Sequence, residues 1–310
     1  MTRRWKAGEG NLDGILILAV LIVIVIAMPR GEGGESFLST APGTAITSSS
    51  ASSNPNTSNP TLASSIYIGS GNASYSYQAY EEYITIDNSG RTPIDITNWQ
   101  LKNGKDTRPY DHGGSLQRFS ADVAVIPQGV AILSPAGNNA LQNIVLGEYE
   151  RAIITTGSPT VQSPYKIVSF KENMCTGYLE ALTDYSFTPA LTQNCPQPRL
   201  EPGIEGMAVQ CRDFINTLPS CQTPKFGGKD RDSLPCSTCV NGTSLTSTCA
   251  NFIKAHFNFQ GCMANHRNDS GFSSRTWRVF LGRGWEMWAD KYETIEVFDQ
   301  FGKLVNFQNY

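Results

Sequence analysis

All eight cysteines of this chain lie in one stretch of its second half, and they limit how that stretch can fold. They are Cys175, Cys195, Cys211, Cys221, Cys236, Cys239, Cys249 and Cys262. An even set of cysteines in an exported chain favours structural disulfides, whose connectivity the sequence does not decide. The pairings Cys211–Cys221 and Cys249–Cys262 are the sterically easiest, because each joins a predicted helix to its exit turn.

Cys236 and Cys239 form the only CxxC motif. This spacing is also typical of a redox pair, or of half a zinc site that Cys249 and His256 would complete. Zinc sites of this kind usually present a second close pair of ligands, which is missing from the sequence. We therefore interpret the motif as part of the disulfide framework, with the redox and zinc alternatives left open.

An apolar run near the N-terminus sets the expected compartment. Residues 14–28 read GILILAVLIVIVIAM, about 22 Å of helix against a hydrocarbon core about 30 Å thick. We expect an uncleaved membrane anchor over residues 12–29, and the alternatives are a cleaved signal peptide, a buried core helix or a type IV pilin leader. Three basic residues precede the run, so residues 1–11 should stay in the cytoplasm and the remainder should cross the plasma membrane.

A segment without charges begins at Ser36, a few residues after the apolar run. Between Ser39 and Ser65, 14 of 27 residues are Ser or Thr, and such a segment buries too little apolar surface to offset the entropy of ordering it. We expect residues 30–65 to form a disordered, Ser/Thr/Pro-rich stalk. N-glycosylation sequons begin at Asn56, Asn72, Asn241 and Asn268, and their modification is left open.

The charge balance bears on the class of partner. Lys and Arg total 24 against 27 Asp and Glu, which gives a net charge of −3. Contacts with phosphates need a basic excess. We therefore expect no nucleic-acid partner.

Short segments of alternating apolar and polar residues flank the cysteine-rich stretch. The predicted strand pairs are residues 82–87 with 93–96, 123–126 with 130–133, and 295–298 with 304–307. Alternation of this kind, interrupted by Gly, Pro and Asn turns, predicts β-hairpins. Several such strands favour a mainly β fold, and a sandwich in particular.

Three blocks carry a family resemblance. They are EEYITIDN and PIDITNWQL at 81–88 and 93–101, VIPQGVAIL at 125–133, and TIEVFD with GKLV at 294–299 and 302–305. In this order they resemble the lamin-tail domain family, with its acidic-aromatic opening strand, its V-D-L-x-x-W-x-L segment, its L-x-P-G-x-x-x-x-L step and its closing hairpin. The resemblance implies an immunoglobulin-like β-sandwich, found in exported bacterial proteins and in nuclear lamins, that binds partners and supplies no catalytic residues.

The sequence departs from that family in one long connection. The resemblance places the sandwich at residues 66–135 and 277–310, so that residues 136–276 form an insertion containing every cysteine. Helical spacing is found for Met207, Cys211, Phe214, Ile215 and Leu218, and for Cys249, Phe252, Ile253 and His256 after a Ser247/Thr248 cap. We expect an α-containing, disulfide-rich insertion with one inward cysteine on each of two helices.

Candidate catalytic residues are few. A hydrolase would need His112, His256 or His266 beside a Ser or Cys nucleophile, and neither a Gly-x-Ser-x-Gly elbow nor an HExxH helix occurs. We expect no catalytic, cofactor-binding or metal-ligating residues. Glu81, Glu82 and Asp87 are read as exposed acidic residues without the ligand spacing of a calcium loop.

The densest aromatic stretch runs from residue 277 to residue 292. Trp277 alternates with Val279 as in a core strand, which predicts packing. Trp285 and Trp288, with Arg283, lie among glycines in a more loop-like context, and aromatic rings with Arg are typical of binding hot spots. We take these three residues as possible ligand contacts.

Together these observations predict a membrane-anchored extracytoplasmic binding or adhesion module with a protein or glycan partner. The alternatives are an anchored hydrolase with its site between sandwich and insertion, and a structural envelope component. The sequence does not identify the ligand or the oligomeric state.

Overall fold

The computed structural model describes residues 60–134, 137, 139–159, 167–183 and 186–310. The chain divides into two units, 1–52 and 53–310, and every element below belongs to the second. The expected anchor at residues 12–29 and most of the stalk lie outside the described residues. Within the described ranges, no helix combines the length and apolar character needed to cross a membrane. A short helix, α2 (Pro60–Ala63), occupies the end of the range expected to be stalk.

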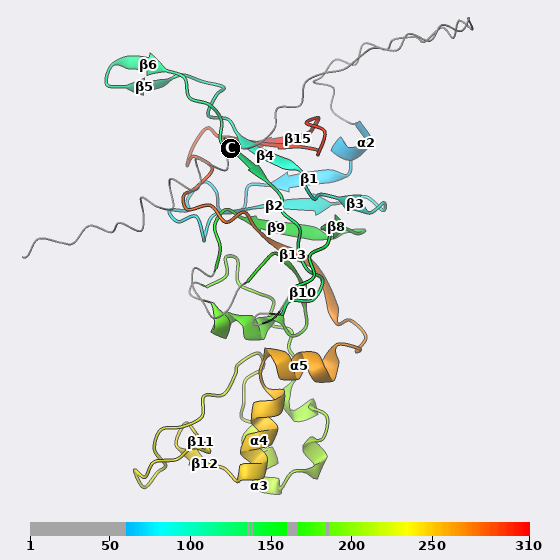
Figure 1. Ribbon diagram of the computed structural model, residues 1–310, viewed down its shortest axis with the longest axis vertical. Coiled ribbons are helices and arrows are strands. Elements are labelled where there is room, and N and C mark those ends of the chain that lie inside the picture. The colour runs from blue at the N-terminus through cyan, green and yellow to red at the C-terminus, as the bar shows by residue number, and fades with distance from the viewer. Residues whose placement is uncertain (1–59, 135–136, 138, 160–166, 184–185) are drawn as a thin grey trace, which may run out of the picture. The chain divides into compact units, whose positions relative to one another are not determined.

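The fold is mainly β, as predicted, and its largest sheet has five strands in the order β1-β2-β9-β13-β10 (Figure 1). Their bounds are Ile66–Gly69 for β1, Tyr83–Asn88 for β2, Arg151–Thr155 for β9, Ser273–Phe280 for β13 and Phe170–Asn173 for β10. Neighbouring strands are antiparallel except β9 and β13, which are parallel.

A second sheet has four strands in the order β15-β14-β4-β7. These strands are Leu304–Asn309 (β15), Thr294–Phe298 (β14), Gln100–Asn103 (β4) and Val123–Val125 (β7). Three two-stranded sheets complete the β structure. They pair β3 (Ile94–Asp95) with β8 (Val145–Leu146), β5 (Tyr110–His112) with β6 (Ser115–Gln117), and β11 (Cys239–Val240) with β12 (Thr243–Ser244).

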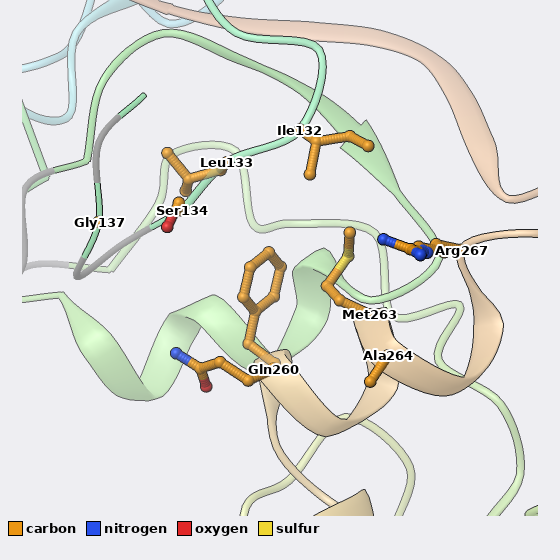
Figure 2. A pocket seen from close by; sticks show the side chains of 9 residues that line it. Ile132, Leu133, Ser134, Gly137, Gln260, Met263, Ala264 and Arg267 are labelled. Atoms are coloured by element: carbon orange, nitrogen blue, oxygen red, sulfur yellow. The ribbon is translucent and has the colours of Figure 1, made fainter. Parts of the chain in front are cut away.

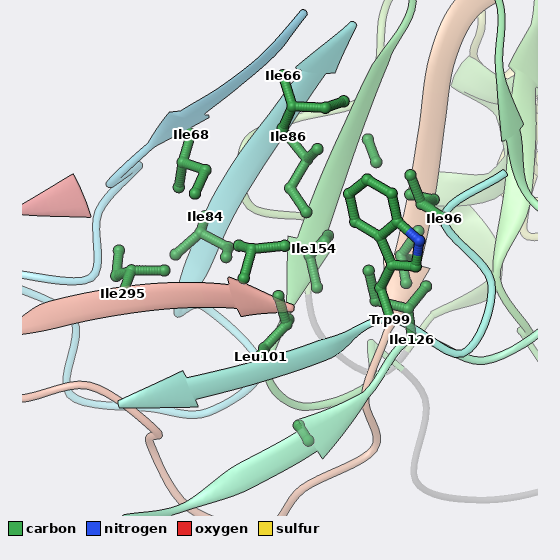
Figure 3. Close-up of a cluster of buried hydrophobic side chains, with 14 of the residues drawn as sticks. Ile66, Ile68, Ile84, Ile86, Ile96, Trp99, Leu101, Ile126, Ile154 and Ile295 are labelled. Carbon is green, nitrogen blue, oxygen red and sulfur yellow. The ribbon is translucent and has the colours of Figure 1, made fainter. Parts of the chain in front are cut away.

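One hydrophobic core is shared by the two larger sheets. Strand β2 alternates half-buried and buried residues along its whole length, so Ile84 and Ile86 point to one face. They meet Ile154 of the same sheet and Leu101 and Ile295 of the other in a single cluster (Figure 3). Burial of this alternating apolar face is what joins the sheets, because each buried Leu or Ile side chain contributes about 1.5–3 kcal/mol.

The first predicted hairpin, residues 82–87 with 93–96, is wrong. Strand β2 pairs with β1 and β9, and β3 pairs with β8. The side-chain amide of Asn88 donates to the carbonyl oxygens of Thr92, Leu146 and Gly147 at 2.9, 3.0 and 3.0 Å. These bonds tie the turn after β2 to the end of β8, so the chain does not fold back on β2.

The second predicted pair, residues 123–126 with 130–133, is also wrong. Strand β7 pairs with β4, and Val130 makes only an isolated bridge with Phe170. The backbone of Val130 exchanges hydrogen bonds with Ser169 and Lys171 instead, because the chain after β7 crosses to the edge of the larger sheet. The terminal hairpin is confirmed, since β14 and β15 are antiparallel neighbours.

Two strands of the five-stranded sheet come from the range 136–276 that was expected to be an insertion. Strand β9 lies between β2 and β13 at the middle of the sheet, and β10 lies at its edge. The boundary expected at residue 136 therefore runs through the sheet, and the helical, cysteine-rich part begins only after β10.

The cysteine-rich part is built from short helices. They are η1 (Thr176–Leu182), η2 (Pro198–Leu200), η3 (Ile204–Gly206), α3 (Val209–Ile215), α4 (Ser247–His256) and α5 (Phe259–His266). The two predicted helices are confirmed as α3 and α4. The cap of α4 is Thr246, whose hydroxyl accepts a hydrogen bond from the Cys249 N–H at 3.2 Å, rather than Ser247 or Thr248.

Every cysteine is in a disulfide, as predicted, but the two suggested pairings are wrong. The bonds are Cys175–Cys262, Cys195–Cys221, Cys211–Cys249 and Cys236–Cys239. Cys211 and Cys249 both point into the cluster between α3 and α4, so they join the helices to each other and not to their own exit turns. The zinc alternative fails because Cys236, Cys239 and Cys249 have no thiolate left to donate.

Candidate binding surface and buried polar sites

Trp285 lies on the surface, beside Arg283, as the sequence suggested. Its side chain is 63% exposed, and the Arg283 guanidinium lies over the ring at 5.5 Å from the centroid. The same guanidinium donates to the carbonyl oxygen of Val123 at 2.9 Å and lies 3.6 Å from a carboxylate oxygen of Asp122. Arg283 is thus fixed to the end of β7 while it supports the indole ring.

This pair continues into a row of alternating cations and rings. Asp122 also pairs with Lys105 at 3.5 Å. The Lys105 ammonium lies 5.7 Å from the centroid of the Phe119 ring, which meets the Tyr110 ring edge-on at 5.9 Å. The contacts therefore continue along the surface to the β5–β6 hairpin.

Arg108 closes the row. Its guanidinium lies 5.3 Å from the centroid of the Tyr110 ring and 6.0 Å from that of Tyr292, and it donates to the carbonyl oxygen of Lys291 at 3.3 Å. Tyr292 is 81% exposed, and Leu116 of strand β6 is also exposed. We call this set the aromatic–cation surface; it consists of Lys105, Arg108, Tyr110, Phe119, Asp122, Arg283, Trp285 and Tyr292.

The loop that carries Trp285 is held from beneath by a buried carboxylate. Glu82 accepts hydrogen bonds from the backbone N–H groups of Met287 and Trp288 at 2.7 and 3.2 Å, and from the Thr156 hydroxyl at 2.6 Å. Burial raises the pKa of Glu82, although these three bonds oppose the shift. Glu82 is fully buried, so its interpretation as an exposed acidic residue is wrong.

A second buried carboxylate holds the C-terminal part of the same loop. Glu293 accepts from the backbone N–H groups of Gly104, Ala289 and Thr294 at 2.7, 3.0 and 2.8 Å. The loop between β13 and β14 is therefore fixed at its middle and at its C-terminal end. A fixed loop loses little conformational entropy when a partner binds.

Trp288 and Trp277 belong to the core. They are 4% and 2% exposed and belong to the cluster shared by the two larger sheets. The packing prediction for Trp277 agrees with this position. Trp288 comes from the same loop as Trp285, but its backbone bond to Glu82 turns this part of the loop inward, so its ring does not lie on the surface.

Two of the three histidines meet around one carboxylate. His256 Nδ1 lies 2.9 Å and His266 Nε2 3.2 Å from the two carboxylate oxygens of buried Glu201. His266 Nδ1 lies 2.7 Å from Asp269, and Asn265 lies 3.1 Å from His256 Nδ1. Among the described residues, the hydrogen-bond partners of these imidazoles are carboxylates and an amide, with no hydroxyl or thiol nucleophile. His112 ends strand β5, apart in the sequence from this cluster.

The environment of His266 shifts its titration. Burial lowers the pKa of the imidazole, but the hydrogen bonds to Asp269 and Glu201 outweigh burial, so the pKa of His266 is raised. Burial, followed by the Glu201 charge, raises the pKa of nearby Tyr178 to about 12. The cluster joins Glu201, which follows η2, to the helices α4 and α5 through hydrogen bonds to a carboxylate.

A separate pocket of about 530 Å³ lies between Ile132–Leu133 and helix α5. Figure 2 shows Met263 and the Arg267 side chain beside it, with Ile132 and Leu133 opposite. Its lining is mostly apolar, and Arg267 is the one charged residue among those that line it.

The three sequons within the described residues differ in accessibility. The side-chain amide of Asn72 is buried and bonded to the Glu81 carbonyl oxygen and the Tyr83 N–H, which leaves no room for a glycan. Asn241 is exposed in the turn between β11 and β12, and Asn268 is exposed after α5. Asn56 lies outside the described residues.

Comparisons with known proteins add no relative: no protein-family model, no curated protein and no solved structure matches the chain.

Sequence reasoning missed most of the aromatic–cation surface. Arg108, Tyr110 and Phe119 lie far from Trp285 in the sequence, and only the fold brings them together. The one available signal was the loss of apolar alternation between β4 and β7, where aromatic and basic residues occur in a polar segment.

Proposed function

We propose that this protein is a membrane-anchored, extracytoplasmic recognition module for a protein or glycan partner. In this proposal residues 12–29 form the anchor, residues 30–59 extend the stalk, and the two larger sheets form a lamin-tail-like, immunoglobulin-like sandwich. The shared core of these sheets supports the sandwich assignment. Four disulfides support an oxidising compartment.

The observation that carries the binding role is the aromatic–cation surface. Exposed Trp and Tyr rings beside arginines have the composition of binding hot spots. Each ring is an amphipathic contact with few rotamers to lose. The two buried carboxylates, Glu82 and Glu293, hold the loop of Trp285 and Tyr292 in place, so the rings are presented ready to bind.

The hydrolase alternative would rest on His256 and His266. Their partners within the described ranges are Glu201, Asp269 and Asn265, an arrangement that favours a structural role for the imidazoles over base catalysis at a hydroxyl. We therefore propose a non-enzymatic role. A structural envelope role would lead to self-assembly without a foreign ligand.

A binding screen tests the proposal. The full-length protein, purified in mild detergent, is applied to a panel of immobilised glycans and to intact cells. We expect saturable binding. Loss of cell binding after protease treatment identifies a protein partner, and loss after periodate oxidation of sugars identifies a glycan. If the protein binds neither the glycans nor the cells and only associates with itself, the recognition role is contradicted.

A further inference from the structure

The Cys236–Cys239 disulfide has different surroundings from the other three. Cysteines of the other bonds belong to the two hydrophobic clusters of the helical part. Cys236 and Cys239 belong to neither cluster. Cys239 is buried, while Cys236 is partly exposed, so one sulfur of this bond can be approached from solvent.

This disulfide also closes the shortest loop. Its cysteines are 3 residues apart, against 26, 38 and 87 residues for the others. A disulfide constrains the unfolded chain less when its loop is shorter. Backbone hydrogen bonds already hold the segment that this disulfide closes. The Gly227 N–H donates to the Cys239 carbonyl oxygen and the Cys236 N–H to the Gly228 carbonyl oxygen, both at 3.0 Å. The bond is therefore the one that the fold needs least.

Polar groups adjoin the exposed sulfur. Cys236 Sγ lies 3.8 Å from the Thr238 hydroxyl and 4.0 Å from the Ser244 hydroxyl. Hydroxyl donors at these positions stabilise negative charge on Cys236 Sγ, the sulfur that leaves as a thiolate when a mixed disulfide at Cys236 is resolved. The other three bonds are buried in the hydrophobic clusters, where a thiolate from solvent cannot reach them, although Cys221 Sγ accepts a hydrogen bond from the Cys195 N–H at 3.2 Å.

We propose that Cys236–Cys239 is a thiol-exchange site, whose partner is a thiol. A partner thiolate attacks Cys236 Sγ, a new sulfur–sulfur bond forms there, and the bond to Cys239 breaks. Cys239 Sγ leaves with the electron pair and takes a proton. A second thiolate then attacks the partner sulfur of the mixed disulfide, which releases the oxidised partner disulfide and Cys236 as a thiolate. Two electrons pass from the two thiols to this bond. The proposal does not depend on the proposed recognition function.

Graded reduction tests the site in the full-length protein. The protein is equilibrated in glutathione buffers of increasing reducing strength, quenched with N-ethylmaleimide and mapped by mass spectrometry. We expect Cys236 and Cys239 to be alkylated at a ratio of reduced to oxidised glutathione at least about tenfold lower than the other six cysteines require. The trapped glutathione adduct should be on Cys236. Opening of all four bonds together, or an adduct on Cys239, would overturn the proposal.

A second arm uses a reduced protein dithiol in place of glutathione. Faster opening by the protein dithiol than by glutathione identifies a protein partner, and the reverse identifies a small thiol. Two double variants test whether the Cys236–Cys239 bond contributes to the stability of the fold. Cys236→Ser with Cys239→Ser should keep its thermal transition within a few degrees, whereas Cys211→Ser with Cys249→Ser should lower it markedly. An equal loss in both variants would show that the CxxC bond is structural.

Discussion

At the scale of single residues, two buried carboxylates determine where the surface loop lies. Neither is expected from the sequence, because the residues next to Glu82 before β2 and next to Glu293 before β14 do not show the distant donors that each carboxylate meets. Burial of Glu82 is compensated by three hydrogen-bond donors from residues 156, 287 and 288. Two of those donors lie more than two hundred positions away in the chain, so no local pattern could have shown them.

Substitution of Glu82 by Gln should destabilise the protein. A single amide oxygen replaces two carboxylate oxygens, and the amide N–H groups face backbone donors, which leaves buried donors unpaired at a cost of about 1–3 kcal/mol. Urea unfolding measures this loss. The matched control is Glu81→Gln, whose half-buried side chain has no recorded hydrogen bond within the described part of the chain; an equal loss in both variants would contradict this role of Glu82.

The His266 cluster predicts a dependence of stability on pH. Glu201 and Asp269 lie within hydrogen-bond distance of the His266 imidazole, and His256 and Tyr178 interact with the same Glu201 carboxylate. The folded pKa of His266 is raised. The stabilisation is therefore fully present below the unfolded pKa of about 6.5, and it is lost as the pH rises through the folded pKa. Unfolding free energies measured in steps from about pH 5.5 to 9 should fall in the wild type. They should fall less in His266→Gln, and parallel profiles would refute the assignment.

At the scale of elements, strands with one buried face were predictable and the central strand was not. Strands β2 and β14 alternate because one face meets the core and the other does not. Strand β9 reads RAIIT, and its last four residues are all buried. Such a strand shows no alternation, and it lay in a range expected to be an insertion. Two pairings were mispredicted because β2 and β3 belong to different sheets, and the chain after β7 leaves its sheet for the edge of the larger one.

The position of β9 makes Ile154 a test of the sheet. Ile154 is fully buried in the shared core, so Ile154→Ala should cost about 2–5 kcal/mol in a single cooperative transition. Val125→Ala, on the exposed side of edge strand β7, should cost less than about 1 kcal/mol. Differential scanning calorimetry compares both variants. A second, separate unfolding transition in Ile154→Ala would contradict this position of β9, because it would show that residues 136–276 unfold independently of the other strands.

At the scale of the whole molecule, the sequence predicted the class of fold and the disulfide-rich part better than the aromatic–cation surface. The helices α3 and α4 follow from spacing that is local, and so does the terminal hairpin. The aromatic–cation surface joins the β5–β6 hairpin, the end of β7 and the loop after β13. It exists only when these distant segments are folded together, so sequence reasoning found Trp285 and Arg283 and missed the remainder.

The measurement that tests the recognition role most directly compares binding by surface variants. Full-length wild type, Trp285→Ala with Tyr292→Ala, and Phe301→Ala are titrated on the glycan panel and on intact cells. Phe301 is 78% exposed in the turn between β14 and β15, outside the aromatic–cation surface. We predict that the double variant binds at least about tenfold more weakly, since hot-spot residues each contribute about 1–2 kcal/mol or more, and that Phe301→Ala binds like the wild type. Undiminished binding by the double variant would contradict the account.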